Sequence, residues 1–470
     1  MRTLCGLCDA RYLCVAAVLL VDVIALSAGG FKRRICLVIC VVVPGSPTGP
    51  PLNSRGCHLM PTTVGNHDFV PLLFGGDINV YSMARAFNEA YGIVSAGYGM
   101  AKSGVCLDSR ILDYESIEAA DQPQIIASLI SNFCEKHPNQ KVLLIPVGDN
   151  YIQSLALVRE QLPDSAIDFG ITLQRFDLLT DKARFFDLCR RYRLSCPDTH
   201  VFDSDSNPGS LKHVDIELPW IIKPAKGVDY WQHPFTGQEK VHLIRSRPEA
   251  AALIERMRTA GYTSDIIIQG YIPGDDTHMR VLTTYSSSDG VVRLSCMGHV
   301  LLEEHTPKGQ GNHAVIISEQ DLPTELKVRA VLEDLGYTGP ANFDFKLDKR
   351  DGLLKVFECN VRQGRSSYYV TASGTNLAQV MTEDLIYGRR GDYISVCAPA
   401  LWLVVPEQVA FDYTPTKPYH EQMHKLIAMG RAVNPLLNPI DSGLKHRTRI
   451  QKLLASQPDK FRRFYHREQM

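Results

Sequence analysis

The chain has 470 residues, of which 45% are hydrophobic and 21% are charged, and its formal net charge is −1 at pH 7. This composition is that of an ordinary globular protein, and the length allows two or three domains, each with its own core. A net charge so close to zero carries no sign of a nucleic-acid partner, and none is expected.

The cysteines are distributed unevenly. Six of the 13 lie before residue 60, whereas the other seven are scattered singly over the remaining chain. Scattered single cysteines are typical of a protein whose thiols stay reduced, so the sequence predicts a cytoplasmic protein without a disulfide framework.

Residues 1–65 differ in composition from the rest of the chain. An apolar run at 12–26 follows two arginines and imitates a secretory signal peptide, and a shorter run covers 35–44. Asp22 interrupts the first run and the second is too short to span a bilayer, so no stable membrane insertion is expected. A signal or anchor, a disordered leader, and an over-long start with the true initiator at Met60 remain open; we favour the last.

From residue 66 to about 195, apolar runs alternate with Gly-rich turns and helical patterns. Strands are predicted at 69–74, 93–96 and 141–146, and helices at 80–91 and 123–136. This alternation predicts a parallel sheet with helices on both faces, in which ligands bind beyond the carboxyl ends of the strands, at 75–77 and 148–150. Neither a dinucleotide fingerprint after a strand nor a P-loop occurs, so a nucleotide's phosphates would need another kind of binding site.

Two lysines occupy positions at which an anion would stabilise them. Lys182 lies in the first turn of an amphipathic helix predicted at 180–192, although a surface lysine is the simpler interpretation. Lys223 interrupts the apolar run 219–224, a predicted buried strand, where an ammonium group is costly unless an anion such as phosphate meets it or its stem reaches solvent. The Gly-containing stretch 225–238 predicts a mobile loop.

A third apolar run, 266–272, ends irregularly in Gln269, Gly270, Tyr271 and Ile272. Such an ending exposes backbone donors and acceptors beside apolar side chains, as binding of an adenine edge requires. Arg280 opens the next predicted strand, 279–285.

Two alternating runs, 342–347 and 355–360, flank turn-forming residues and predict an antiparallel hairpin. Glu358 and Asn360 share a face because they are two residues apart, and pairing across the hairpin brings Asp344 opposite them. Three hard oxygen donors suit Mg²⁺. A solvated acidic hairpin is the alternative, and a shifted register would turn Asp348 inward in place of Asp344.

The last 80 residues carry a predicted strand at 401–405, a helix at 419–429 and a basic segment from Gly443 to Met470. A solvated helix face is the usual meaning of such a basic segment. Attraction to an anionic precursor, linked to a nucleotide or to a lipid, is the alternative.

The order of these elements resembles the ATP-grasp superfamily of carboxylate-amine ligases. The sequence is similar within it to the bacterial ligases that add D-aspartate to the lysine side chain of a peptidoglycan precursor, and the stretches that carry this similarity are 74–92, 272–282, 298–307 and 337–378. The resemblance covers about residues 68–390, continues more loosely to the end and leaves out the first 65.

This resemblance implies an α/β protein with an ATP-grasp fold. A leader (1–65) would precede an amino-terminal Rossmann-like, pre-ATP-grasp domain (66–195), an ATP-grasp domain (196–390) and a short carboxy-terminal extension with a basic tail (391–470). The implied cofactors are ATP and Mg²⁺, and the implied partners are D-aspartate and a peptidoglycan precursor bearing a lysine amine. Another amino acid or amine acceptor, or an ATP-binding protein that has lost turnover, remain alternatives.

The resemblance also implies roles for individual residues. Lys182 and Lys223 resemble the lysines that hold the ATP phosphates, Gln269–Ile272 the adenine hinge, and Asp344, Glu358 and Asn360 the magnesium ligands. Arg280 and Arg362 resemble groups that face the transferred phosphate or the activated carboxylate. ATP would phosphorylate a carboxylate, the loop at 225–238 would shield the acyl phosphate from water, and the amine would then displace phosphate.

Overall fold

The computed structural model describes residues 12–18, 38–44, 67–307, 309–415 and 417–465. The chain divides into two units, residues 1–60 and 61–470. The described part of the first unit is an antiparallel pair of strands, β1 (Tyr12–Val18) and β2 (Val38–Pro44). The sequence predicts no strands there, and the rest of the predicted leader lies outside the described residues.

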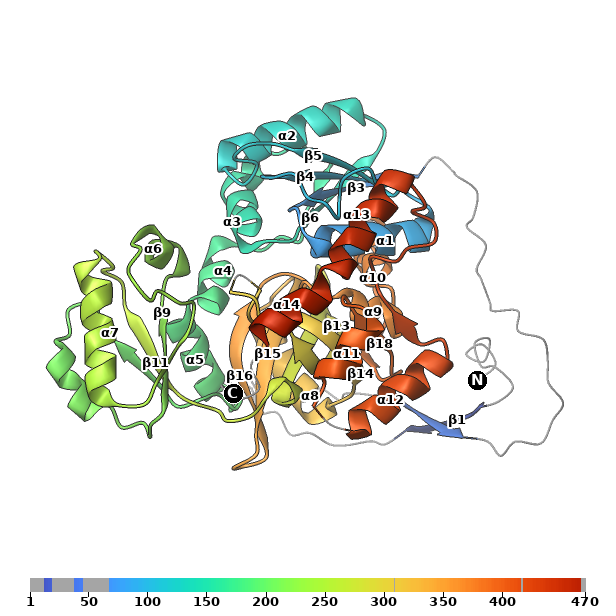
Figure 1. The fold of residues 1–470 in the computed structure, drawn as a ribbon. Helices are drawn as coiled ribbons and strands as arrows, with labels where there is room; N and C mark the ends of the chain where they lie inside the picture. The colour runs from blue at the N-terminus through green and yellow to red at the C-terminus, as the bar shows by residue number, and fades with distance from the viewer. Residues whose placement is uncertain (1–11, 19–37, 45–66, 308, 416, 466–470) are drawn as a thin grey trace. The chain divides into compact units, whose positions relative to one another are not determined.

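The second unit begins with a five-stranded parallel sheet in the order β5-β4-β3-β6-β7. Its strands are β3 (Phe69–Phe74), β4 (Ser95–Gly99), β5 (Leu112–Ser116), β6 (Lys141–Pro146) and β7 (Ala166–Ile167). Successive residues of β3 pack on opposite sides of the sheet. Leu72 belongs to a cluster with α2 (Pro123–Lys136) and α3 (Asp149–Val158), and Leu73 belongs to one with α1 (Ile78–Tyr91). Helices therefore cover both faces, as Figure 1 shows and the alternating sequence predicts.

The turn after β3 requires glycine. Gly75 has φ +144°, and a Cβ built there would lie 2.2 Å from Cγ2 of Val147. This turn starts α1, whose N-cap is Asp77; its carboxylate accepts the N–H of Asn79 at 3.0 Å. The carboxyl end of β3 is thus fixed tightly.

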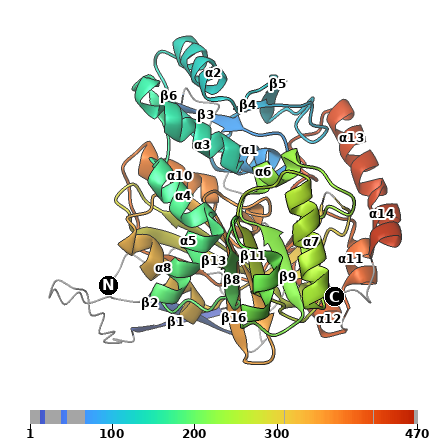
Figure 2. The same ribbon diagram turned by 90° about the vertical axis from the view of Figure 1, so that its left-hand side faces the viewer.

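A smaller antiparallel sheet follows, in the order β10-β9-β11-β8. Its elements are α4 (Leu173–Thr180), α5 (Lys182–Arg191), β8 (Thr199–Phe202), β9 (Trp220–Pro224), α6 (Gly227–Gln232), β10 (His242–Ile244), α7 (Arg247–Thr259) and β11 (Ile266–Gly270), the two helices α4 and α5 preceding the strands. Residues of β9, β11 and α7 share one apolar cluster, and Figure 2 shows α7 beside these strands.

The stretch 225–238 is more ordered than the sequence predicts. It contains α6, and Tyr230 on that helix is fully buried. The hydroxyl of Tyr230 donates to the carbonyl of Glu239 at 2.8 Å, and Nε2 of Gln238 donates to the carbonyl of Tyr230 at 2.8 Å. The stretch therefore contains a helix anchored in the core through Tyr230, where the sequence predicts a loop.

The largest sheet has the order β16-β15-β12-β13-β14-β18-β19, with β17 added beside β13. Its strands are β12 (Met279–Ser286), β13 (Val292–Glu303), β14 (His313–Glu319), β15 (Gly339–Asp348), β16 (Leu353–Asn360), β17 (Ile394–Val396), β18 (Leu401–Leu403) and β19 (Ala432–Val433). The helices between them are α8 (Leu322–Asp334), α9 (Tyr368–Ala372) and α10 (Leu377–Leu385). Three of its strands come from the predicted carboxy-terminal extension, so that segment is part of the same sheet.

The remaining helices are α11 (Glu407–Tyr413), α12 (Lys417–Ala428), α13 (Leu444–Ala455) and α14 (Gln457–Phe464), and three short 3₁₀ turns lie at 159–161, 208–213 and 276–278. Met423 of α12 and Phe461 of α14 share an apolar cluster with strands β14 and β18. None of the helices that the structure describes is long and apolar enough to cross a membrane.

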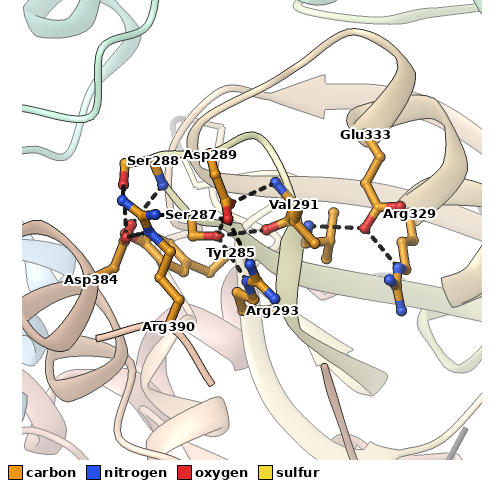
Figure 3. Close-up of polar contacts among 11 residues, drawn as sticks. Tyr285, Ser287, Ser288, Asp289, Val291, Arg293, Arg329, Glu333, Asp384 and Arg390 are labelled. Atoms are coloured by element: carbon orange, nitrogen blue, oxygen red, sulfur yellow. Dashed lines mark hydrogen bonds and ion pairs between the residues drawn. The ribbon is translucent and has the colours of Figure 1, made fainter. Parts of the chain in front are cut away.

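A buried carboxylate fastens the β12–β13 hairpin to α10 (Figure 3). Asp384, 5% exposed, accepts hydrogen bonds from the hydroxyl of Tyr285 at 2.8 Å, the N–H and hydroxyl of Ser288 at 2.7 and 2.8 Å, and Nε of Arg390 at 2.9 Å. Four donors therefore depend on one side chain.

We expect Asp384→Ala to lower the free energy of unfolding by about 3 kcal/mol, because the buried donors lose their acceptor. Denaturant unfolding followed by circular dichroism measures the change. Glu383→Ala on the same helix is the control, since its ion pair with Arg389 lies at the surface, and it should cost less than about 1 kcal/mol. Equal effects of the two substitutions would show that the network does not stabilise the hairpin.

Candidate functional site

The three predicted metal ligands lie together on the β15–β16 hairpin. The two strands pair with Asp344 directly opposite Glu358, and Asn360 follows Glu358 on the same face. Nδ2 of Asn360 donates to Oδ2 of Asp344 at 3.3 Å. The hairpin register thus brings two carboxylates and one amide to one point, as the alternation of the sequence predicts.

The alternative register, with Asp348 turned toward this point, does not occur. Asp348 lies opposite Leu353 at the other end of the hairpin. Its carboxylate accepts from Nη2 of Arg350 at 2.7 Å and Nζ of Lys355 at 2.9 Å. The hydrogen bonds from Arg350 hold the pKa of Asp348 well below its usual range. Asp348 therefore closes the hairpin turn.

The two carboxylates of the cluster differ in their electrostatic surroundings. Burial, and then the charge of Glu358, raises the pKa of Asp344. Burial acts on Glu358 in the same direction, but its pKa is lowered because cationic side chains lie near it. The lysines that lower it are, in decreasing order of effect, Lys182, Lys240 and Lys223. Lys182 at the start of α5, Lys223 on β9 and Lys240 just before β10 therefore all act electrostatically on the hairpin.

Both predicted phosphate lysines have defined positions. Lys182 begins α5, which Asp181 caps by accepting the N–H of Arg184 at 3.0 Å. Lys223 is 9% exposed in β9, with Nζ 5.8 Å from the ring centroid of Phe186. Burial, and then the nearby charge of Lys182, lowers the pKa of Lys223 to about 7. Ammonium groups held so close together fit an anionic ligand such as a triphosphate.

This pKa predicts how nucleotide affinity depends on pH. A phosphate beside Lys223 raises its pKa, so the complex holds more protons than the free protein above pH 7, and ATP affinity must fall as pH rises. We expect a loss of up to about tenfold per pH unit between pH 7.5 and 9. Titration calorimetry measures it. Lys223→Arg, which stays charged, should flatten this dependence; an unchanged slope in that variant would assign the effect to another group.

The predicted adenine hinge, Gln269–Ile272, starts at the end of β11. The side chain of Gln269 is buried and donates to a threonine hydroxyl of β8 at 2.9 Å. The N–H of Tyr271 donates to the backbone carbonyl before β9 at 3.0 Å, and its own carbonyl accepts from Arg350 at 3.2 Å. Within the described residues the N–H of Ile272 makes no hydrogen bond, so it is the hinge donor that remains for an adenine edge.

Arg362 connects the hairpin with the parallel sheet. Its Nη2 donates to Oδ1 of Asn360 at 3.2 Å, and its Nε bonds to Oδ1 of Asp149 at 2.9 Å. Asp149 begins α3 beyond the carboxyl end of β6, within the predicted ligand edge at 148–150. Nearby, Nδ2 of Asn79 on α1 donates to the carbonyl of Gln363 at 3.1 Å. Arg362 therefore lies where the ligand edge of the parallel sheet meets the metal hairpin.

Arg280 does not join this cluster. β12 pairs with β15 so that Val281 is opposite Asp344 and Arg280 is opposite Phe345. Adjacent residues of a strand point to opposite faces, so Arg280 points away from Asp344. Its guanidinium is bonded to Glu319 and donates to the carbonyl of Thr277 at 3.0 Å. The position of Arg280 therefore gives no support to a catalytic role, because strand alternation places it on the wrong face.

Sequence reasoning missed several charged residues near the cluster. Nε2 of His313, at the start of β14, lies 3.7 Å from Oε1 of Glu303 and 3.9 Å from Oδ1 of Asp344. Burial, and then Asp276 and Asp344, raises the pKa of Glu303 to about 8. The charge of Lys240 acts to lower the pKa of both Asp344 and Glu358. His313, Glu303 and Lys240 all lie tens of residues before the hairpin in the sequence. For Glu303 and His313, the available signal was a polar residue inside an apolar run.

The donor set fits Mg²⁺ with a nucleotide. No three His, Cys, Asp or Glu side chains among the described residues form a metal site by themselves, so Asp344 and Glu358 need an amide and phosphate oxygens to complete the coordination. Asn360 turns Nδ2 toward Asp344 and Oδ1 toward Arg362, so a half-turn of its amide that presents Oδ1 to a metal also releases Nη2 of Arg362. The nearby lysines would offset the charge of the phosphates.

Comparison with known sequences finds two kinds of enzyme that are similar to this chain. The chain is 34% identical over 418 residues to D-aspartate ligase of Enterococcus faecium, covering 87% of this chain and 99% of that enzyme. It is also 24% identical over 228 residues to the arginine-specific large chain of carbamoyl phosphate synthase of Geobacillus stearothermophilus, covering 46% of this chain and 20% of that one. No family model matches the chain.

Solved structures share the fold at low sequence identity. N5-carboxyaminoimidazole synthetase of Staphylococcus aureus in complex with ADP matches with a TM-score of 0.53 and 14% identity, covering 76% of this chain and 86% of that one. The biotin carboxylase domain of 2-oxoglutarate carboxylase of Hydrogenobacter thermophilus, in complex with MgADP, matches with a TM-score of 0.53 and 14% identity, covering 72% and 74%. Solved structures with this α/β architecture therefore include complexes with nucleotides.

Proposed function

This chain belongs to the ATP-grasp family of carboxylate-amine ligases, and we propose that it joins D-aspartate to the lysine amine of a peptidoglycan precursor, with release of ADP and phosphate. The effect of the Lys182 and Lys223 charges, which lower the pKa of Glu358 on the metal hairpin, carries the proposed assignment of the nucleotide site. The similarity to a D-aspartate ligase over nearly that enzyme's whole length supports the choice of substrates.

The proposed reaction has two steps. A carboxylate is a poor acceptor for an amine because its oxygen is a poor leaving group. ATP therefore transfers its γ-phosphoryl group to a carboxylate oxygen of aspartate, and the amine then attacks the acyl phosphate and expels phosphate. Positioning and neutralisation of charge supply most of the catalysis in the first step.

Each part of the site has a proposed task. Asp344, Glu358 and Asn360 hold Mg²⁺, which when bound offsets the charge of the transferring phosphoryl group. Lys182 and Lys223 orient the phosphates, and residues 269–272 hold the adenine through the free N–H of Ile272. Arg362 faces the carboxylate that is activated and stabilises the oxyanion that forms when the amine attacks.

The position of the amino-acid substrate follows from that of Arg362. Its guanidinium lies between Asn360 of the metal hairpin and Asp149 at the ligand edge of the parallel sheet. A carboxylate bound at Arg362 would therefore have the nucleotide on one side and the parallel sheet on the other. We propose that the parallel sheet contributes the contacts that distinguish one amino acid from another.

Phosphate release from ATP tests the proposed substrates. Purified protein is supplied with D-aspartate or L-aspartate, with and without a lysine-containing muramyl pentapeptide. We expect phosphate release and a peptide heavier by one aspartyl residue with the D-isomer and peptide together. Release with another amino acid, or with another amine acceptor, would keep the ligase mechanism and replace the substrates. Nucleotide binding without any release would favour a protein that has lost turnover.

A further inference from the structure

The ligand-facing side of β15 carries a lysine to which the proposed reaction gives no task. Side chains along a strand alternate between its two faces, so Lys346 points to the same face as Asp344. Phe343 and Phe345, on the opposite face, are fully buried in the core. Two residues along a strand span about 7 Å, so Lys346 lies one step from the proposed metal site toward the hairpin turn.

The turn end of this hairpin contacts the proposed adenine hinge. Nη2 of Arg350, in the turn between β15 and β16, donates to the carbonyl of Tyr271 at 3.2 Å. Asp348 fixes the same guanidinium by accepting from its Nε at 2.8 Å and its Nη2 at 2.7 Å. Asp344 and Glu358 lie opposite each other farther from the turn. The hinge and the proposed metal site are therefore at two different points along one hairpin, whose strands lie side by side in Figure 1.

Lys346 lies between these two points. It is midway between Asp344 and Asp348 along β15. Its Nζ is 5.6 Å from the ring centroid of Tyr271 in the hinge. A nucleotide with its base at the hinge and its phosphates at the metal ligands must therefore pass over Lys346.

Carboxylates gather around the Lys346 ammonium. Burial lowers the pKa of Lys346. The charges that oppose this shift are those of Glu303, Asp276 and Asp275. The two aspartates follow the hinge after a Pro-Gly turn. Asp276 is 3% exposed, and its Oδ2 accepts from the N–H of Glu303 and from Nε2 of His305, both at 2.9 Å. The surroundings of Lys346 are therefore polar and carry charges of both signs.

This mixture of one ammonium and several carboxylates fits a neutral group with hydroxyls better than it fits a phosphate. Carboxylates repel phosphate oxygens, whereas a hydroxyl can donate to a carboxylate and accept from an ammonium. The ribose of a nucleotide is such a group. It lies between the base and the phosphates, as Lys346 lies between the hinge and the metal ligands.

We propose that Lys346 donates a hydrogen bond to a ribose hydroxyl of the bound ATP and so makes the protein select ribonucleotides over deoxyribonucleotides. This inference rests on the proposed nucleotide site and adds a specificity residue to it. Lys346 lies away from the transferred phosphoryl group, so its loss should raise the KM for ATP and leave kcat within about twofold.

Titration calorimetry of the full-length protein with Mg²⁺ compares ATP, 2′-deoxyATP and 3′-deoxyATP. The unaltered protein should bind ATP about tenfold more tightly than at least one of the deoxynucleotides. Lys346→Met keeps the apolar stem and removes the ammonium. It should weaken ATP binding about tenfold and binding of that deoxynucleotide less than about twofold. Lys349→Met is the matched control, because it removes an exposed lysine from the turn of the same hairpin and should leave all three affinities within about twofold.

The inference is overturned if Lys346→Met weakens ATP and both deoxynucleotides equally, or if it changes none of the affinities. Equal binding of the three nucleotides by the unaltered protein also overturns it. In each case ATP binding by the unaltered protein leaves the proposed nucleotide site in place, whereas the absence of any ATP binding would refute that site and this inference together. If Lys346→Met does not fold, Lys346→Gln, whose shorter side chain also lacks the charge, gives the same comparison.

Discussion

Glu358→Gln is expected to lower magnesium-dependent ATP turnover by about 10³-fold or more, the largest effect of any single substitution proposed for this protein. The charges of Lys182, Lys240 and Lys223 lower the pKa of Glu358. Glu358 also lies directly opposite Asp344 in the hairpin. Glutamine keeps the shape of the side chain but removes the negative charge that would hold Mg²⁺ against the phosphates. Phosphate release over a range of Mg²⁺ concentrations measures the effect.

Asp351→Asn is the matched control for this substitution, because it removes a carboxylate from the turn of the same hairpin. Asp351 pairs with Lys355 at 2.9 Å, away from the cluster. Its turnover should stay within about twofold of the unaltered protein, as is usual for a surface ion pair. Near-normal turnover in Glu358→Gln would refute the metal assignment.

Arg362→Ala should leave ATP binding largely intact and lower the rate of ligation by about 10²–10³-fold. The guanidinium joins Asn360 to Asp149 but does not contact the lysines or the hinge in any described hydrogen bond or ion pair. Its loss therefore removes charge at the reacting carboxylate rather than at the nucleotide. Calorimetric titration of ATP and the rate of peptide ligation measure the two effects separately.

Arg389→Ala serves as the control, since the side chain of Arg389 is 71% exposed. It should change neither nucleotide affinity nor ligation. A loss of nucleotide affinity in Arg362→Ala equal to the loss of ligation would argue against the assigned role, because it would place Arg362 in the nucleotide site.

Local sequence patterns predicted the hairpin and the parallel sheet well. β6 and α2 begin and end at the predicted residues. The pairing of Asp344 with Glu358 also follows from alternation, because the side-chain period of two and a short turn leave few registers for a hairpin. These predictions needed information from neighbouring residues alone.

Contacts between distant segments could not be predicted in the same way. The placement of His313 and Glu303 beside Asp344 depends on how β13, β14 and β15 are ordered in the sheet, which no local pattern gives. Arg280 was predicted to act in catalysis, yet the alternation of β12 turns it to the other face. The glycines of 225–238 predicted a loop, but the stretch contains α6, on which Tyr230 is fully buried.

Transfer of oxygen from the carboxylate to phosphate tests the central claim most directly. D-aspartate labelled with ¹⁸O in both carboxyl groups is ligated to the muramyl pentapeptide in the presence of ATP, and the released phosphate is analysed by mass spectrometry. If ATP phosphorylates the carboxylate, each phosphate carries one ¹⁸O, because the amine breaks the bond between carbon and that oxygen. Ligated product together with unlabelled phosphate, or with AMP in place of ADP, would contradict the account.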